Sequence, residues 1–331
     1  MTILFLGGTG NISTECAALL HRRGHQIVIL SRGKSPVPPE YRAVVADRKD
    51  PDSLRRAVAG LKVDVVANFI GYEVGDLETD YSVWRGAIGQ YVFISSATVY
   101  AKPAPRLPIA EDSPLGNAWW DYAQKKLACE EWLRCLPPGS EFPWTIVRPS
   151  HTYSKRWIPN VVSSSTYTVA ARLEQGRPVF VPDDGENPWT LTAASDFAVG
   201  FAGLVGNPRA LGEAFHITSD EVLTWNQIYA RIAEAVGAPA PVIERIPTDF
   251  ICEIAPHLTG TLKGDKAHPG IFDNSKIKRL VPDFTCRKPF AEGIREAVAW
   301  LRAHPEQQNL NPQVDRTIDD VIKAWKKRAA P

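Results

Sequence analysis

Short apolar runs that alternate with helical patterns constrain this chain more than any other feature of its sequence. The runs lie at residues 2–7, 25–31, 41–46, 62–70, 90–96 and 144–149. Runs that are apolar at nearly every position are typical of strands buried on both faces, as in a parallel sheet. Helical patterns occupy the gaps at 12–23, 51–59 and 119–135. The alternation predicts an α/β fold built on a doubly wound parallel sheet.

The second half of the chain has a different texture. Pro, Gly and Ser become frequent after residue 149, and longer loops separate helices expected around 225–237, 290–303 and 317–328. The sequence therefore predicts a sheet domain in 1–149 and mainly a smaller lobe in 150–331. A segment at about 191–206 is expected to return to the first domain.

Charge and composition exclude several classes of protein. The chain has 38 basic and 37 acidic residues, without the basic patch that favours nucleic acid as a partner. The five cysteines form no CxxC pair and no cluster with histidine, so we expect no metal. The sequence contains no apolar stretch of membrane-spanning length and does not begin like a signal peptide. We therefore expect a cytoplasmic protein with a small-molecule substrate.

A glycine-rich loop follows the first apolar run, in the segment FLGGTGNIS. Glycines between a strand and a helix permit a tight turn, and the helix N-terminus offers free N–H groups to a pyrophosphate. Ser13 stands where the third glycine of this spacing is common. The sequence predicts a dinucleotide-binding Rossmann domain whose loop contacts the cofactor through Gly7, Gly8, Thr9, Gly10, Asn11 and Ile12.

The end of the second run indicates which dinucleotide is bound. A carboxylate at this place binds the ribose 2′-hydroxyl of NAD, whereas this chain has Ser31 and Arg32. A guanidinium attracts a 2′-phosphate, so NADP is favoured over NAD. Asp47, after the third run, is placed to meet the adenine, and Asn68, in the fourth run, is expected near the nicotinamide.

Three further residues carry the predicted chemistry. Ser96 ends the fifth run, where a parallel strand delivers side chains to the ligand crevice. Tyr122 and Lys126 are four residues apart in a helical pattern, so they share one face of that helix. Spacing alone is weak evidence, and the dinucleotide loop gives the pair its context.

The segments GGTGNIS, SSATVY, YAQKK, IVRPSHTY and FDNSKIKRLVPDF, in this order, resemble the extended or atypical short-chain dehydrogenases/reductases of the NAD-dependent epimerase/dehydratase family. The resemblance implies that Tyr122 takes a proton from a carbinol while hydride passes to the nicotinamide. It also implies that Lys126 stabilises the phenolate and holds the nicotinamide ribose, and that Ser96 bonds the reacting oxygen. A free phenol has a pKa near 10, so a neighbouring ammonium is expected to lower it. A homodimer through the 119–135 helix is implied as well.

The same resemblance narrows the substrate. Ser96-Ala97-Thr98 replaces the Thr-Asp-Glu run of sugar-nucleotide dehydratases, so epimerisation or simple redox is favoured over dehydration. The segment 187–196 lacks the arginine that clamps a diphosphate, which indicates a sugar-like substrate of lower negative charge. Expected substrate contacts are Tyr72, Thr98, His151 and Trp189. His151 is equally explained as a satisfied loop histidine, and Trp189 as a core side chain.

Two alternatives stay open. The first is an NADPH-dependent carbonyl reductase of a small metabolite, which Arg32 fits. The second is a non-catalytic protein, because the chain also resembles the chloroplast stem-loop RNA-binding branch of the superfamily. The neutral charge balance and the Ser96, Tyr122 and Lys126 set argue against RNA binding.

Overall fold

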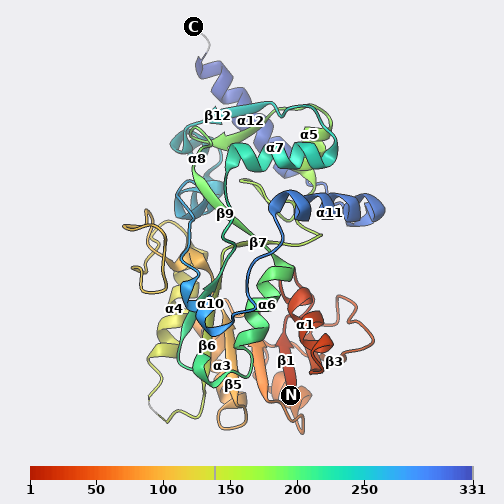
Figure 1. Cartoon of the computed structure of the whole chain (residues 1–331), viewed down its shortest axis with the longest axis vertical. Helices are drawn as coiled ribbons and strands as arrows, with labels where there is room; N and C mark the ends of the chain where they lie inside the picture. The colour runs from red at the N-terminus through yellow and green to blue at the C-terminus, as the bar shows by residue number, and fades with distance from the viewer. Residues whose placement is uncertain (138, 330–331) are drawn as a thin grey trace.

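A parallel sheet of seven strands occupies the lower half of the molecule in Figure 1, with strand order β10-β6-β5-β4-β1-β2-β3. The structure is a computed structural model that describes residues 1–137 and 139–329. The strands are β1 (Thr2–Leu6), β2 (Gln26–Ser31), β3 (Arg42–Val45), β4 (Val65–Asn68), β5 (Gln90–Ile94), β6 (Trp144–Pro149) and β10 (Ala214–Ile217). Each neighbouring pair is parallel. The predicted doubly wound α/β fold is confirmed.

Helices cover both faces of this sheet. Successive residues of β1 point to opposite faces, so Ile3 and Phe5 enter one apolar cluster and Leu4 and Leu6 enter another. The first cluster includes side chains of α1 (Ser13–Arg22), α6 (Ala194–Leu204) and α10 (Ser275–Leu280). The second includes side chains of α2 (Pro51–Val58), α3 (Val74–Trp84) and α4 (Asp121–Arg134).

Helix α3 has no counterpart among the predicted helices. It begins Val-Gly-Asp, and glycine is a poor helix former, although Val74, Leu77, Tyr81 and Trp84 stand at helical spacing. Its N-terminus is nevertheless fixed by a capping box, in which Glu73 and Asp76 each accept a hydrogen bond from the other's backbone N–H. Packing of Leu77 and Trp84 against the sheet then stabilises a helix that the sequence pattern did not indicate.

The chain returns to the sheet after its first excursion into the upper half of Figure 1. Phe197 and Phe201 of α6 pack in the same cluster as Cys16 and Leu20 of α1. Strand β10 then pairs in parallel with β6 and forms the edge of the sheet. The returning segment therefore extends from residue 194 to residue 217.

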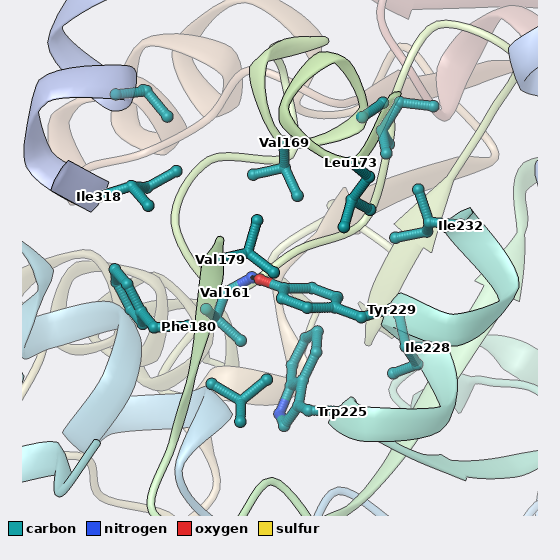
Figure 2. Close-up of a cluster of buried hydrophobic side chains, with 14 of the residues drawn as sticks. Val161, Val169, Leu173, Val179, Phe180, Trp225, Ile228, Tyr229, Ile232 and Ile318 are labelled. Atoms are coloured by element: carbon teal, nitrogen blue, oxygen red, sulfur yellow. Dashed lines mark hydrogen bonds between the residues drawn. The ribbon is translucent and has the colours of Figure 1, made fainter. Parts of the chain in front are cut away.

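The upper lobe in Figure 1 has its own apolar core, drawn in Figure 2. Its strands are β7 (His151–Tyr153), β9 (Pro188–Ala193) and β11 (Val222–Thr224) in one sheet, and β8 (Val179–Pro182) and β12 (Ile243–Ile246) in another. Its helices are α5 (Thr168–Glu174), α7 (Trp225–Val236), α8 (Thr248–Ile254), α9 (Thr259–Thr261), α11 (Phe290–Ala303) and α12 (Pro312–Ala329). The three helices predicted in this half are present as α7, α11 and α12, the last beginning five residues earlier than expected.

Short helical turns complete the described chain. They are η1 (Ala97–Val99), η2 (Pro208–Ala210), η3 (Pro256–Leu258), η4 (Leu262–Lys266) and η5 (Pro305–Gln307). Turn η4 is a π-helical turn and carries residues of the site described below. None of the helices in the described part of the chain is long and apolar enough to cross a membrane.

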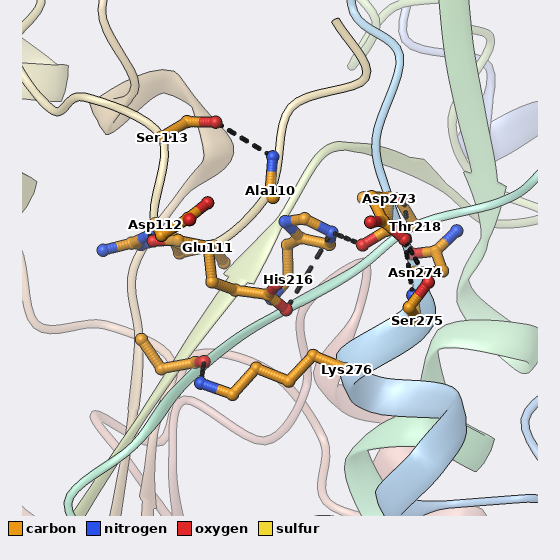
Figure 3. A network of polar contacts seen from close by, with 12 residues as sticks. Ala110, Glu111, Asp112, Ser113, His216, Thr218, Asp273, Asn274, Ser275 and Lys276 are labelled. Carbon is orange, nitrogen blue, oxygen red and sulfur yellow. Dashed lines mark hydrogen bonds and ion pairs between the residues drawn. The ribbon is translucent and has the colours of Figure 1, made fainter. Parts of the chain in front are cut away.

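A buried polar junction ties the edge strand β10 to two loops (Figure 3). The ring of His216 is fully buried; one nitrogen lies 3.1 Å from the Tyr100 hydroxyl and the other 2.7 Å from the Asp273 carbonyl oxygen. Glu111 accepts the backbone N–H of His216 at 3.2 Å. Burial lowers the pKa of His216 to about 4, so the ring is neutral at pH 7. The junction holds β10 against the segments that carry Tyr100, Glu111 and Asp273.

Candidate functional site

A cavity of about 600 Å³ lies between the carboxyl ends of the sheet strands and the upper lobe. Ligands of open parallel sheets bind at this edge, and the volume is in the range of small-molecule sites. The predicted site residues that line it are Gly7, Gly10, Asn11, Ile12, Tyr72, Ser96, Thr98, Tyr122, Lys126, His151 and Trp189. Folding therefore brings together most of a site that is dispersed along the sequence.

The glycine loop forms the lower wall of the cavity. Gly7 has a φ of +82°, and a Cβ there would overlap Cγ2 of Ile70, so only glycine fits. The Ser13 hydroxyl accepts the Gly10 N–H at 2.9 Å and donates to the Gly7 carbonyl at 2.7 Å. Serine at the third glycine position thus braces the turn.

The N-terminus of α1 opens into the same wall. Ile12 precedes the helix and makes no side-chain capping bond. The Thr14 N–H donates to the Gly10 carbonyl oxygen at 3.3 Å, and the N–H groups of Ser13 and Glu15 are left for another acceptor. The Asn11 side chain does not cap the helix either; it donates to the Thr152 carbonyl at 2.9 Å and accepts from the Ser154 hydroxyl at 2.6 Å. A tight glycine turn that leads into an uncapped helix N-terminus fits the phosphates of a dinucleotide.

Lys126 is buried in the cavity wall, with 2% of its surface exposed. Its ammonium donates to the carbonyl oxygens of Gly71 at 2.6 Å and Ile94 at 2.7 Å. It also lies 4.8 Å from the centre of the Tyr72 ring and 5.9 Å from that of Tyr122. Burial lowers the pKa of Lys126 to about 8. The two carbonyls hold one ammonium, mostly charged at pH 7, beside the tyrosine.

Tyr122 lies one turn before Lys126 on α4 and faces the same cavity. Burial raises its pKa to about 12, and the Ser96 hydroxyl acts in the opposite direction. The phenol is therefore protonated at neutral pH. We expected Lys126 to bring this pKa toward neutrality, and in this structure burial outweighs any such effect. The Ser96 hydroxyl itself accepts bonds from the Thr98 N–H at 3.2 Å and the Thr98 hydroxyl at 2.9 Å.

Comparison with known proteins identifies the family. The model of the NAD dependent epimerase/dehydratase family matches residues 3–218. The chain belongs to this family. It is 29% identical to 2′-dehydrokanamycin reductase of Streptomyces kanamyceticus, over 91% of this chain and 84% of that protein. It is 28% identical to chloroplast stem-loop binding protein of 41 kDa b of Arabidopsis thaliana, over 75% of this chain and 67% of that protein.

Solved structures agree with the fold. The UDP-glucose 4-epimerase of Thermotoga maritima superposes with a TM-score of 0.74 at 16% identity, covering 92% of this chain and 99% of that chain. The UDP-glucose 4-epimerase of Thermus thermophilus superposes with a TM-score of 0.72 at 20% identity, covering 92% and 100%. At such identity the likeness shows the fold. The prediction of an enzyme of this epimerase/dehydratase family is confirmed at the level of the family.

Other residues that we predicted to contact the cofactor lie outside the cavity wall. Gly8 is buried against Ile29, and Thr9 is half-buried in the turn. Ser31 is the last residue of β2 and its hydroxyl accepts the Gly33 N–H at 3.2 Å, while the Arg32 side chain is exposed. Asp47 is exposed beyond β3 and accepts the Lys49 N–H at 3.0 Å. β2 lies beside β1 and β3 lies beside β2, all in parallel. These residues therefore lie at the carboxyl ends of the strands, where the glycine loop also lies.

Asn68 was expected near the nicotinamide, but its side chain is bonded to other residues of the protein. Its side-chain oxygen accepts from Arg48 at 3.3 Å and from the Ile70 N–H at 2.9 Å. Its NH₂ group donates to Asp80 and to the Tyr91 hydroxyl, both at 2.7 Å. The side chain is fully buried and all its bonding capacity is used. It therefore fixes the end of β4 against α3 and β5.

His151 and Trp189 face each other across the upper wall. The Trp189 Nε1–H donates to Nδ1 of His151 at 3.2 Å, so Nδ1 carries no proton. The neutral ring then carries its proton on Nε2, which donates to the Ser164 hydroxyl at 2.9 Å. Burial lowers the pKa of His151 well below its ordinary value. His151 is a fixed neutral ring, and Trp189 is at once a cavity wall and part of the upper core.

Sequence reasoning missed several polar residues of the cavity. They are Lys102, Thr190, Asp265 and Lys266. The hydroxyls of Thr190 and of Ser95, the neighbour of Ser96, are buried and find no hydrogen-bond partner among the described residues. Lys102, Asp265 and Lys266 lie in loops or in η4, without any periodic signal.

Proposed function

We propose that this protein is a nicotinamide-dinucleotide-dependent oxidoreductase that acts at a carbinol or carbonyl carbon of a sugar-like substrate. The observation that carries the proposal is one cavity lined by the glycine loop at its lower wall and by Ser96, Tyr122 and Lys126 beside it. When bound, the nicotinamide supplies or accepts hydride. The chain's own residues would bind the phosphates, orient the substrate oxygen and move its proton.

Tyr122 is the proposed acid–base group. Its pKa of about 12 keeps the phenol protonated at pH 7, so it is ready to donate a proton to a carbonyl oxygen as that carbon is reduced. In the opposite direction a phenolate must form, and the Lys126 ammonium favours it. The Ser96 hydroxyl, which Thr98 holds through two bonds, orients the same oxygen. No carboxylate follows Ser96 in the Ser-Ala-Thr segment, which supports redox or epimerisation over dehydration.

The protonated phenol favours reduction of a carbonyl as the resting direction. Epimerisation is the second candidate, because it joins an oxidation and a reduction at one carbon with the same residues. Its support is the 31% identity to UDP-glucose 4-epimerase of Neisseria meningitidis, a match that spans only 40% of this chain. NADP is the proposed dinucleotide, since Arg32 is exposed at the end of β2 and no carboxylate accompanies it there. A homodimer through α4 and a cytoplasmic location stay predictions.

The test is a titration of the purified full-length protein with NADPH and with NADH, in which fluorescence reports binding. We expect both to bind, NADPH more tightly, and NADPH to be oxidised when a keto sugar is added. Binding of neither dinucleotide would overturn the proposal and favour the non-catalytic, stem-loop-binding reading. Conversion of a UDP-hexose to its 4-epimer without net change in NADPH would select the second candidate.

A further inference from the structure

We propose that the upper end of the cavity is a carboxylate subsite, in which Lys266 and Lys102 hold an acidic group of the substrate ring. The inference rests on the proposed function, because it names the class of substrate for the same site: a cyclic, uronic-acid-like carbinol or carbonyl compound. Two buried ammonium groups that share one carboxylate carry the argument.

Lys266 has unused hydrogen-bonding capacity. Its ammonium donates to the Thr261 hydroxyl at 2.9 Å, and this is its one bond within the described residues. An ammonium has three donors, so two are left for a ligand. The backbone is fixed, since the Lys266 carbonyl accepts from Trp225 Nε1 at 2.9 Å and from Asn187 at 3.2 Å. The lysine is therefore held at the cavity wall by its main chain, and two of its three ammonium donors stay available to a ligand.

The charges at this end do not balance. Lys102, with 2% of its side chain exposed, lies 3.7 Å from the Asp265 carboxylate. The charge of Lys266, the next residue, also interacts with that of Asp265, so two ammonium groups face one carboxylate and one positive charge is in excess. Burial leaves the Lys266 ammonium poorly solvated and lowers its pKa to about 8. A carboxylate of the ligand would neutralise the excess and accept the free N–H groups.

Further groups suit a ring that carries such an acid. The Thr190 hydroxyl is 1% exposed, lines the cavity and has no partner among the described residues, so a donor is available to a second carboxylate oxygen. The rings of Trp120, Trp189 and Phe272 line the same end and offer faces to a sugar ring. The centre of the Trp120 ring lies 5.1 Å from that of Tyr122, which places this end of the cavity close to the proposed acid–base group.

The same charge count argues against other substrates. A diphosphate brings two negative charges against one excess positive charge, so one negative charge would stay unbalanced. No arginine lines the described cavity to form paired bonds with phosphate oxygens. An amino sugar is repelled by both lysines. One carboxylate is the anion that the site balances.

The experiment measures binding to the full-length protein saturated with NADPH, by calorimetry with glucuronate, glucose, glucosamine and glucose 6-phosphate as probes. We expect glucuronate to bind about 10-fold more tightly than glucose, since hydrogen bonds to charged groups strengthen the contact. Its advantage should fall above pH 8, as Lys266 loses its proton. Equal binding of glucose and glucuronate, or tighter binding of glucosamine or glucose 6-phosphate, would overturn the proposal.

The variants Lys266→Met and Lys266→Gln should remove the glucuronate advantage and leave the affinity for NADPH unchanged. The matched control is Lys263→Met in the same turn, because Lys263 pairs with Asp249 and does not line the cavity. A glucuronate advantage that persists in both Lys266 variants would also overturn the assignment. Failure of NADPH to bind the unmodified protein would instead count against the proposed function, so the two failures are distinguishable.

Discussion

The two ends of the cavity are built in different ways. The lower end consists of backbone from one continuous loop, residues 7–13, stiffened by the Ser13 hydroxyl. The upper end consists of side chains from segments far apart in the chain, including Lys102, Thr190 and Lys266. Backbone groups recognise a phosphate whatever the rest of the ligand is, whereas side chains select one substrate. The difference explains why the lower end identifies a family and the upper end does not.

Between the two ends lies the proposed acid–base pair, where the largest effect is expected. Tyr122→Phe removes only the hydroxyl, so we expect turnover to fall by about 10²- to 10⁴-fold, the usual contribution of a general acid. Affinity for NADPH should be unchanged. Tyr81→Phe on α3 is the control, because that ring packs on Trp132 and Phe142, away from the cavity. Steady-state rates and fluorescence titration check both; full activity in Tyr122→Phe would disprove the role.

The junction around His216 joins β10, at the edge of the sheet, to the loops that carry Glu111 and Asp273. Its folded pKa of about 4 lies below the unfolded value near 6.5, so the unfolded state binds more protons between these pH values. This group therefore costs stability as the pH falls, about 2 kcal/mol between pH 7 and pH 5.

Chemical denaturation at both pH values tests this prediction. Glu111, Lys276, Arg148 and Asp273 face His216, so the wild-type curve alone does not isolate the ring. His216→Gln should lose stability at pH 7 but show a flatter dependence on pH than the wild type. The exposed His257→Gln variant is the control, and an unchanged slope in His216→Gln would contradict the assignment.

A single methyl group tests the lower end of the cavity. In Gly7→Ala the new Cβ meets Ile70 at a φ of +82°, so we expect a loss of about 2 kcal/mol of folding stability and weaker NADPH binding. Gly75→Ala on α3 is the control, because nothing lies within 4 Å of its Cβ and its φ is ordinary. Thermal unfolding with and without NADPH separates the two effects. A stable, binding-competent Gly7→Ala protein would show that the turn is less constrained than its geometry indicates.

The smallest effect is expected at Arg32, which follows β2 near the glycine loop at the lower end of the cavity. Arg32→Asp should weaken NADPH about 10-fold and leave NADH unaffected or improved, because the aspartate repels the 2′-phosphate. Arg42→Asp is the control. Arg42 is also exposed, but it lies at the amino end of β3, whereas the glycine loop lies at the carboxyl ends of the strands. Paired titrations with both dinucleotides give the ratio. A ratio that does not change would remove the support for NADP.

Local pattern was enough for the lower end and for the architecture. Strands β1, β2, β4, β5 and β6 follow the apolar runs, because strands buried on both faces must be apolar at nearly every residue. β3 is an edge strand and is largely exposed. The glycine turn was visible because the loop is continuous in sequence. Tyr122 and Lys126 were found because one helical turn separates them. Helix α3 was missed, although Val74, Leu77, Tyr81 and Trp84 stand at helical spacing, because the segment is short and Gly75 lies in its first turn.

Only the tertiary structure decided which side chains meet across the cavity. Lys102, Asp265 and Lys266 carry no periodic signal in the sequence. Their charged groups come together only in the folded chain, at the cavity between the sheet and the upper lobe. Asn68 ends a strand that points to the site, yet a buried network with Arg48, Asp80 and Tyr91 uses all its bonds. The sequence by itself determined the sheet, the loop and the reactive pair, because each depends on neighbours in the chain. The charged groups at the upper end of the cavity come from segments far apart in the chain, so only the tertiary structure shows that they lie together.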